Sequence, residues 1–213
     1  MVRKIWDLHP EFAVREKPFE HEEIAPFMHL YRASWDGQAF IDALEEIAEP
    51  GDWHMSSTGD VTDRRYSKYR DSLSFGLMAY LGDEDPDERV KDFQKIALPI
   101  IYDLERAVWD YRVKNDVVVT SNQGWFVNKY GHGGQYKIHT DHSGSYKRIF
   151  SIIAYLNTVK DGGNTVFPYQ NVDSQCVEGN IIVFPSSYPY RHVSAPTGSA
   201  SDEVKYSIVS FFS

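Results

Sequence analysis

The sequence predicts an α+β fold whose core is a double-stranded β-helix, or jelly roll, with supporting helices in the N-terminal half. Two observations lead to this prediction. Apolar residues recur at helical spacing in two segments of the first half, near residues 36–50 and 85–108. From Asp116 onward the pattern changes to short β-rich runs separated by turn residues. Helices before a block of short strands are typical of α+β domains, and a double-sheet arrangement encloses a site between its sheets.

The first helix is predicted after a weakly patterned lead-in. Residues 1–35 have no sustained period, and we expect them to be extended and partly strand-forming. Asp36 is a suitable N-cap, because its side chain can accept a hydrogen bond from a free backbone N–H of the first turn. One apolar stripe follows, made of Phe40, Ile41, Leu44 and Ile47. The pattern therefore predicts a helix that ends before Pro50.

A strand and a long helix come next. Residues 51–71 are polar and rich in turn formers, and the alternation of Leu73, Phe75, Leu77 and Ala79 then predicts a strand. The second helix begins near Asp85-Pro86. Its apolar side consists of Phe93, Ile96, Ala97, Ile100, Ile101, Leu104 and Val108. Pro99 lacks a backbone donor, so it should kink or divide this helix.

The second half is predicted to hold eight strands. They are expected at residues 117–121, 124–130, 136–141, 148–156, 164–168, 180–184, 189–193 and 204–212. The length of 213 residues fits one domain, 1–213, in which residues 1–115 form helical and strand support and 116–213 form the jelly-roll core.

Composition limits the function classes. The net charge of −9 argues against general binding to nucleic acid, and no run of 18 apolar residues could span a membrane. The charged start lacks the apolar stretch of a secretory signal, and the lone Cys176 cannot form an internal disulfide. We therefore expect a cytoplasmic protein; the sequence does not indicate its oligomeric state.

His139-Thr140-Asp141 is the motif that carries chemistry. Residues i and i+2 of a strand point to one face, so His139 and Asp141 can offer an imidazole and a carboxylate to one ion, with His192 as the third ligand. Two histidines and one carboxylate are typical of non-haem Fe(II) sites with open positions. About 0.7 His-x-Asp tripeptides are expected by chance, so the alternative is a surface histidine. The glycine-rich turn before His139 and the distal His192 favour the metal.

Lys205 and Ser207 lie on the same side of the last predicted strand. An ammonium and a hydroxyl there could hold the distal carboxylate of a dicarboxylic acid lying on the iron. A cation at an inward strand position beside Val209 and Phe211 needs an anion to compensate its burial. Together with the metal motif, this pair indicates an oxygenase.

From about Gly124 to Ser213 the chain resembles the Fe(II)/2-oxoglutarate-dependent dioxygenases, most closely their prolyl 4-hydroxylase-like branch. The resemblance rests on the order of several motifs. They are Tyr130, Tyr136 and His139-x-Asp141; Arg148 and Tyr155-Leu156-Asn157; Gly162 to Pro168; Gly179 and Phe184-Pro185; and His192 with Lys205-Tyr206-Ser207. Two positions depart from the family, Asn164 where an acidic residue is common and Phe211 where tryptophan is common.

The resemblance implies a role for each matching residue. His139, Asp141 and His192 would be the iron ligands, and Lys205 would bind the C5 carboxylate of 2-oxoglutarate. The positions that surround the cosubstrate are matched by Tyr130, Tyr155 and Thr165, and those facing the substrate by Tyr136 and Arg148. Strands favour aromatic and β-branched residues anyway, so Tyr155 and Thr165 could instead be core residues.

The implied reaction uses Fe(II), 2-oxoglutarate and O₂, with ascorbate as reductant, and hydroxylates an unactivated C–H bond with release of succinate and CO₂. A prolyl residue of a peptide or protein is the expected substrate, in a groove between Tyr136, Arg148 and the basic, aromatic segment Arg64–Arg70. That segment could also be a solvated loop. Three alternatives stay open: a hydroxylase of a free amino acid or small peptide natural product, an AlkB-like nucleic-acid demethylase, and a non-catalytic cupin-like binding module.

Overall fold

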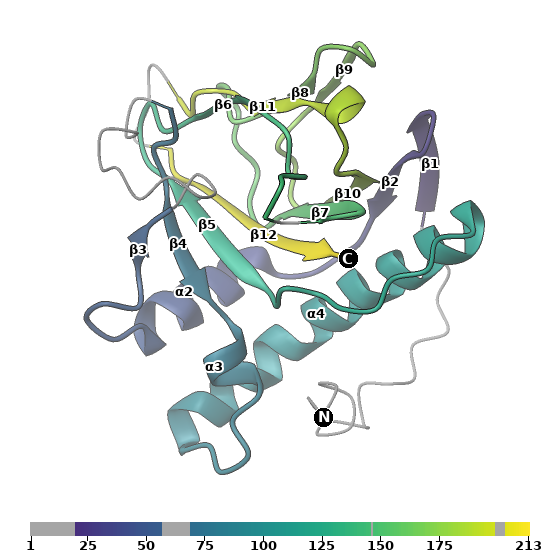
Figure 1. The fold of residues 1–213 in the computed structure, drawn as a ribbon. Helices are drawn as coiled ribbons and strands as arrows, with labels where there is room; N and C mark the ends of the chain where they lie inside the picture. Colours follow the sequence, from purple (N-terminus) through teal and green to yellow (C-terminus); the bar gives the residue numbers. More distant parts are fainter. Residues whose placement is uncertain (1–19, 57–68, 146, 199–202) are drawn as a thin grey trace.

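The computed structural model describes residues 20–56, 69–145, 147–198 and 203–213. Two antiparallel sheets face each other, and helices cover the outer side of the larger one (Figure 1). This is the jelly-roll core with supporting helices that the sequence predicts. The chemistry-bearing residues of the second half lie between the sheets.

Within the described part of the chain, the larger sheet has the strand order β1-β2-β10-β7-β12-β5-β4-β3. Its strands are β1 (Glu20–Ala25), β2 (Met28–Arg32), β3 (His54–Met55), β4 (Leu73–Gly76), β5 (Phe126–Tyr130), β7 (Phe150–Tyr155), β10 (Asn180–Pro185) and β12 (Lys205–Phe212). The smaller sheet has the order β6-β11-β8-β9. It consists of β6 (Tyr136–His139), β8 (Thr165–Phe167), β9 (Val172–Ser174) and β11 (His192–Ser194).

Three helices precede the core strands in the described residues: α2 (Gly37–Ile47), α3 (Met78–Leu81) and α4 (Glu88–Asn115). The Asp36 carboxylate accepts a hydrogen bond from the Ala39 backbone at 2.9 Å, which confirms the predicted cap. Pro99 lies inside α4 without dividing it. Ile96, predicted on the apolar side, is 36% exposed, because the buried stripe of α4 turns past it through Phe93 and Ala97.

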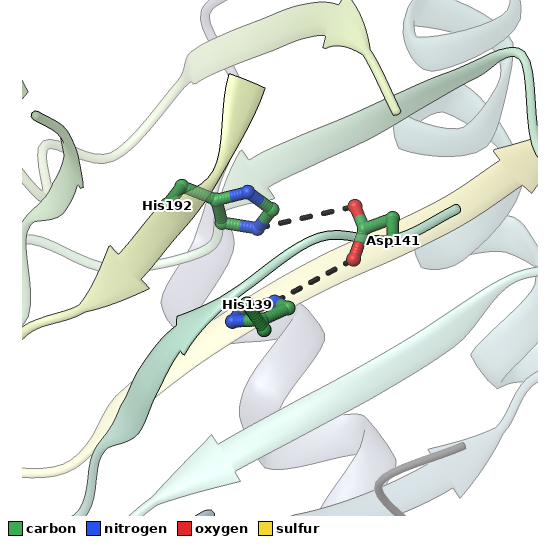
Figure 2. Close-up of side chains that lie close together, drawn as sticks. All are labelled: His139, Asp141 and His192. Carbon is green, nitrogen blue, oxygen red and sulfur yellow. Dashed lines mark ion pairs between the residues drawn. The ribbon is translucent and has the colours of Figure 1, made fainter. Parts of the chain in front are cut away.

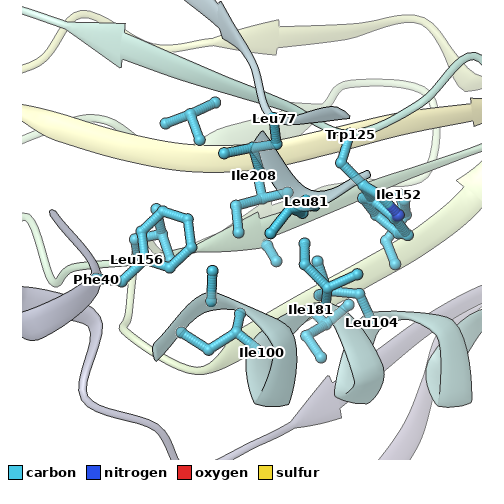
Figure 3. Packing of buried hydrophobic residues seen from close by; sticks show 14 of the residues in the cluster. Phe40, Leu77, Leu81, Ile100, Leu104, Trp125, Ile152, Leu156, Ile181 and Ile208 are labelled. Atoms are coloured by element: carbon cyan, nitrogen blue, oxygen red, sulfur yellow. The ribbon is translucent and has the colours of Figure 1, made fainter. Parts of the chain in front are cut away.

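The main core lies between α2, α4 and the larger sheet (Figure 3). Phe40 and Leu44 of α2 and Ile101 and Leu104 of α4 are fully buried there. Burial of one such side chain contributes about 1.5–3 kcal/mol. A smaller cluster, which includes Tyr155, Phe167 and Phe184, fills one side of the space between the sheets. The helices thus pack against the outer face of the larger sheet, and the inner face of that sheet forms part of the pocket that is described below.

Several predicted strands differ from those of the structure. Residues 117–121 form no strand, and residues 172–174, which were not predicted, form β9. The strand at Leu73 ends at Gly76, because Leu77 and Leu81 bury on one side of a helical turn. The predicted strand 189–193 is instead a 3₁₀ turn (η3, Tyr188–Tyr190) followed by β11.

The described helices include none with the length and apolarity needed to cross a membrane.

Candidate active site

His139, Asp141 and His192 converge on one point, with a ligand atom from each lying within 4.8 Å of the others (Figure 2). His139 ends β6 and His192 begins β11, and the pairing of these strands sets the two histidines opposite each other. Asp141 lies two residues beyond β6 rather than on it. Its carboxylate oxygens are 3.5 Å from His139 Nε2 and 3.9 Å from His192 Nε2. The predicted ligand residues therefore do come together.

The orientation of both imidazoles is fixed by backbone carbonyls. His139 Nδ1 lies 2.8 Å from the Lys137 carbonyl and His192 Nδ1 lies 3.2 Å from the Tyr190 carbonyl. Since a carbonyl oxygen only accepts, each Nδ1 must carry the proton. Each Nε2 is then left with a lone pair directed at the shared point, which is the form that binds a metal ion. Burial lowers the pKa of His192 to about 4, so its ring is neutral at pH 7.

Asp141 is held as a carboxylate. Burial alone would raise its pKa, but His192, His139 and the Ser151 hydroxyl hold the pKa well below its usual range. Ser151 Oγ donates to Asp141 Oδ2 at 2.6 Å, and the Ser186 hydroxyl lies 2.7 Å from Ser151. The three residues thus offer one carboxylate and two imidazole nitrogens to a single point, and this set of ligands suits a divalent cation.

Lys205 is a buried cation at the far end of the same space. Its side chain is 2% exposed, and Nζ donates to the Gly163 carbonyl at 2.5 Å and to Ser194 Oγ at 3.0 Å. The rings of Tyr130 and Tyr155 lie at 5.1 and 5.2 Å from Nζ. Burial lowers the pKa of Lys205 to about 8. Among residues 20–56, 69–145, 147–198 and 203–213, no carboxylate lies within salt-bridge distance of it. Such a site favours binding of an anion.

The residues predicted around the cosubstrate occupy two layers. Tyr130, Thr165 and Ser207 line the space beside Lys205. Tyr155 lies behind them, and its hydroxyl donates to Thr165 Oγ1 at 2.7 Å. Tyr155 is therefore a buried residue that orients the Thr165 hydroxyl.

One pocket of about 420 Å³ lies between the sheets. It is lined by the three candidate metal ligands and by Lys205, Tyr130, Thr165 and Ser207. Lys205, Ser207, Val209 and Phe211 alternate along its floor on β12. The metal-binding cluster forms its wall. A pocket of this size, with polar groups at one end and apolar residues along its floor, suits a small dicarboxylate together with part of a larger substrate.

The two predicted substrate residues also line this pocket. The Tyr136 ring stacks on the His139 imidazole with centroids 3.5 Å apart. The Arg148 guanidinium lies 3.6 Å over the Phe211 ring and donates to Gln123 Oε1 at 2.6 Å. Gln123 and Ser151 were not predicted, because each acts through a contact with a residue distant in sequence and neither belongs to a local motif.

The segment Arg64–Arg70 is described only at its end, since residues 64–68 lie outside the described residues. Tyr69 Oη donates to the Ile138 carbonyl at 2.6 Å, and the Lys137 backbone N–H donates to the Tyr69 carbonyl at 2.9 Å. Arg70 lines the pocket. This end of the segment is therefore part of the pocket wall, bound to β6.

Comparison with protein families gives one match: residues 125–213 match the 2OG-Fe(II) oxygenase superfamily. This range begins just before β5 and contains the three metal-binding candidates and Lys205. A search of curated proteins finds no significant relative.

Many solved structures share the fold, and three of them are described here. A prolyl hydroxylase from Trichoplax adhaerens, solved with a peptide fragment of the hypoxia inducible factor oxygen degradation domain, is 16% identical with a TM-score of 0.62 over 99% of this chain and 93% of its own. A Pseudomonas putida prolyl-4-hydroxylase is 15% identical with a TM-score of 0.59, and 98% of each chain is covered. The collagen prolyl hydroxylase of Paramecium bursaria Chlorella virus-1, solved with 2OG, is 15% identical with a TM-score of 0.55 over 92% and 96%.

Proposed function

We propose that this chain is a dioxygenase that hydroxylates a prolyl residue in a peptide or protein. The chain belongs to the 2OG-Fe(II) oxygenase superfamily, whose model matches residues 125–213. The observation that carries the proposal is the combination, in one pocket, of the metal-binding cluster and the buried ammonium of Lys205. One group binds a divalent cation and the other binds the far end of a dicarboxylate.

The protein residues that would hold Fe(II) are His139, Asp141 and His192, and those that would hold 2-oxoglutarate are Lys205, Ser207, Tyr130 and Thr165. The donor set fits, because both Nε2 atoms and the Asp141 carboxylate are directed at one point. When bound, Fe(II) and 2-oxoglutarate supply O₂ activation and the oxidant for the C–H bond, with succinate and CO₂ as co-products. The superfamily implies both groups and O₂; ascorbate as the reductant is part of the proposal.

The substrate would occupy the part of the pocket that lies away from Lys205. Phe211 lies six residues beyond Lys205 on β12, which is a distance of roughly 20 Å at about 3.3 Å per residue. A five-carbon dicarboxylate covers only the first part of that length. Val209, Phe211 and Arg148 line the rest, where an apolar ring can pack on the floor and water is excluded from the reacting carbon. Tyr136 and Arg148 would orient the substrate there.

Three considerations support a prolyl substrate. The three solved structures described above are all of proteins named as prolyl hydroxylases, and one of them was solved with a peptide. A proline-rich segment is pre-ordered, so it loses little entropy on lying beside aromatic rings such as Tyr136. The net charge of −9 disfavours a nucleic-acid substrate. The proposal includes a cytoplasmic location, which is consistent with the single buried thiol of Cys176.

Mass spectrometry of a panel of proline-containing peptides tests this function. The wild-type protein, Fe(II), 2-oxoglutarate and ascorbate should add one oxygen atom to a proline and release succinate in equal amount. Arg148→Ala should weaken this activity. Arg32→Ala is the matched control, since Arg32 is a surface residue paired with Glu20 and does not line the pocket. Succinate release with free amino acids but with no peptide would refute the peptidyl substrate.

A further inference from the structure

Two exposed tyrosines form a small aromatic surface outside the pocket. Tyr169 is 58% exposed and Tyr188 is 64% exposed, and their ring centroids lie 6.5 Å apart. Pro168 and Pro189, the neighbours of these tyrosines in the sequence, are also exposed. Neither tyrosine hydroxyl has a hydrogen-bond partner among the residues that the structure describes. These four residues form what we call the tyrosine-proline surface.

Two short turns carry this surface, and a side chain joins them. In the turn after β8, the Gln170 backbone N–H donates to the Phe167 carbonyl at 3.2 Å. Gln170 Nε2 donates to the Pro189 carbonyl at 3.0 Å, which links this turn to η3. The Tyr190 hydroxyl donates to the Pro26 carbonyl at 3.0 Å and anchors η3 to the turn between β1 and β2. The backbone of both turns is therefore held in place before any ligand binds, which lowers the cost of ordering it.

The tyrosine-proline surface lies close to the proposed metal site. Tyr188 is four residues before His192, and an extended chain spans at most about 3.6 Å per residue, so their Cα atoms are no more than about 14 Å apart. From His192, β11 runs to Ser194, whose hydroxyl accepts from Lys205. The chain before His192 therefore approaches the metal from the side away from Lys205. That is the side that the proposed substrate would occupy.

The size of the surface favours a short peptide segment over a folded partner. An aromatic side chain buries about 150–250 Å², so two rings exposed to this extent offer only about 250 Å² between them. A stable interface between folded proteins needs about 800 Å² on each partner. A proline-rich segment fits better, because polyproline II presents apolar rings and has backbone carbonyls without internal hydrogen bonds. Tyrosine matches both, with a ring for the prolyl side chain and a hydroxyl that can donate to a carbonyl.

We propose that the tyrosine-proline surface is a second binding site, outside the pocket, for a proline-rich segment that flanks the hydroxylated residue of the substrate. The inference rests on the proposed function and adds a requirement on the sequence around the proline. Polyproline II advances about 3.1 Å per residue, so a separation of about 14 Å corresponds to about four or five residues. The bound segment should therefore begin about four residues from the hydroxylated proline.

Peptide binding measured by fluorescence anisotropy tests the second site without turnover. The protein is loaded with Mn(II) and 2-oxoglutarate in the absence of O₂. Two peptides of equal length share a central proline and differ only in their flanks, which hold either prolines or alanines from the fourth residue outward on both sides; a third, short peptide has no flanks. Wild-type protein should bind the proline-flanked peptide about tenfold more tightly than the alanine-flanked one. Salt should change this advantage little, because the contacts are uncharged.

The variants assign the advantage to the two rings. Tyr169→Ala and Tyr188→Ala should each reduce it about threefold and the double variant should remove it, while affinity for the short peptide stays within about twofold. Tyr188→Phe should keep most of it, because the ring remains. Trp109→Ala is the matched control, since Trp109 is an aromatic residue of α4 that is 65% exposed, and it should change nothing. A 2-oxoglutarate-induced thermal shift equal to that of wild type shows that each variant keeps an intact pocket.

Equal binding of the two flanked peptides by wild type overturns the second site, as does an advantage that survives in the double variant. A concentration-dependent dimer in analytical ultracentrifugation that Tyr188→Ala abolishes would assign the surface to a second copy of the chain and overturn the peptide site. Equal kcat/KM of the Fe(II)-loaded enzyme for the two flanked peptides would overturn only this inference. Hydroxylation of no proline peptide would overturn the proposed function itself.

Discussion

Replacing Lys205 by methionine should weaken 2-oxoglutarate binding and stabilise the ligand-free protein at the same time. Methionine keeps the length and most of the volume of the side chain but removes its charge. In the proposed function the ammonium binds the distal carboxylate, and a charge-assisted hydrogen bond contributes roughly 1.5–3 kcal/mol. The dissociation constant for 2-oxoglutarate should therefore rise roughly 10- to 150-fold.

The stability effect has the opposite sign. Burial lowers the pKa of Lys205 from 10.5 to about 8, so the charged form costs the folded state about 3 kcal/mol at neutral pH. Methionine removes this cost but also loses the hydrogen bonds to Gly163 and Ser194, each contributing roughly 1 kcal/mol. The net gain should be about 1 kcal/mol, which raises Tm by about 2–4 °C in a domain of this size.

Isothermal titration with 2-oxoglutarate and urea denaturation of the ligand-free protein measure the two effects. The control is Lys129→Met, since Lys129 pairs with Glu45 outside the pocket. A variant Lys205→Met that binds 2-oxoglutarate within twofold of wild type would refute Lys205 as the anchor, and Arg191 would be the next candidate. A variant that is destabilised by several kcal/mol would show that the buried charge has a compensating partner in the protein.

Four other outcomes follow from the same contacts. His192→Ala should abolish Mn(II) binding in a titration while circular dichroism shows an unchanged fold; undiminished binding would mean that the third ligand is misassigned. Ser151→Ala should lower metal affinity roughly 10- to 100-fold, since it removes the donor that holds Asp141, and an unchanged affinity would reject this role. Because burial lowers the pKa of Lys205 in the folded state, its charge destabilises that state below about pH 8, and this cost is relieved between about pH 8 and 10.5. The free energy of unfolding of wild type, measured by urea denaturation, should therefore rise relative to that of Lys205→Met in this pH range. Parallel pH dependences of the two proteins would contradict the burial argument. Gly162→Ala should strongly destabilise the turn before β8, because Gly162 has φ +77° and an added Cβ would lie 2.0 Å from the Pro196 carbonyl oxygen. An unchanged Tm would contradict this.

The parts that the sequence predicts well are those with a local signal. Asp36 and the apolar stripe after it specify α2 because cap and period lie within a few turns of chain. His139 and Asp141 are two residues apart, so their convergence needs little more than a strand end. Lys205 and Ser207 were predicted on one strand face, and both line the pocket. In each case the relevant geometry is encoded within a short segment.

The parts that were missed depend on contacts between distant segments. Ser151 meets Asp141 only because β7 lies beneath the turn after β6, and Gln123 meets Arg148 across 25 residues. Arg70 reaches Asn128 across 58 residues. Arg70 belongs to the segment Arg64–Arg70 that was predicted beside the groove, but its contact with Asn128 was not predicted. Hydroxyl and amide groups are common on surfaces, so nothing local marks Ser151 or Gln123. Tertiary packing likewise turned Leu77 from strand into a helical turn.

The most direct test of the account is single turnover under isotopically labelled O₂ with a proline-containing peptide. The protein loaded with Fe(II) and 2-oxoglutarate should place one labelled oxygen atom on the proline and release one succinate for each hydroxylated peptide, and Asp141→Ala should do neither. Succinate release that no peptide stimulates, or a hydroxyl oxygen that comes from a source other than O₂, would contradict it.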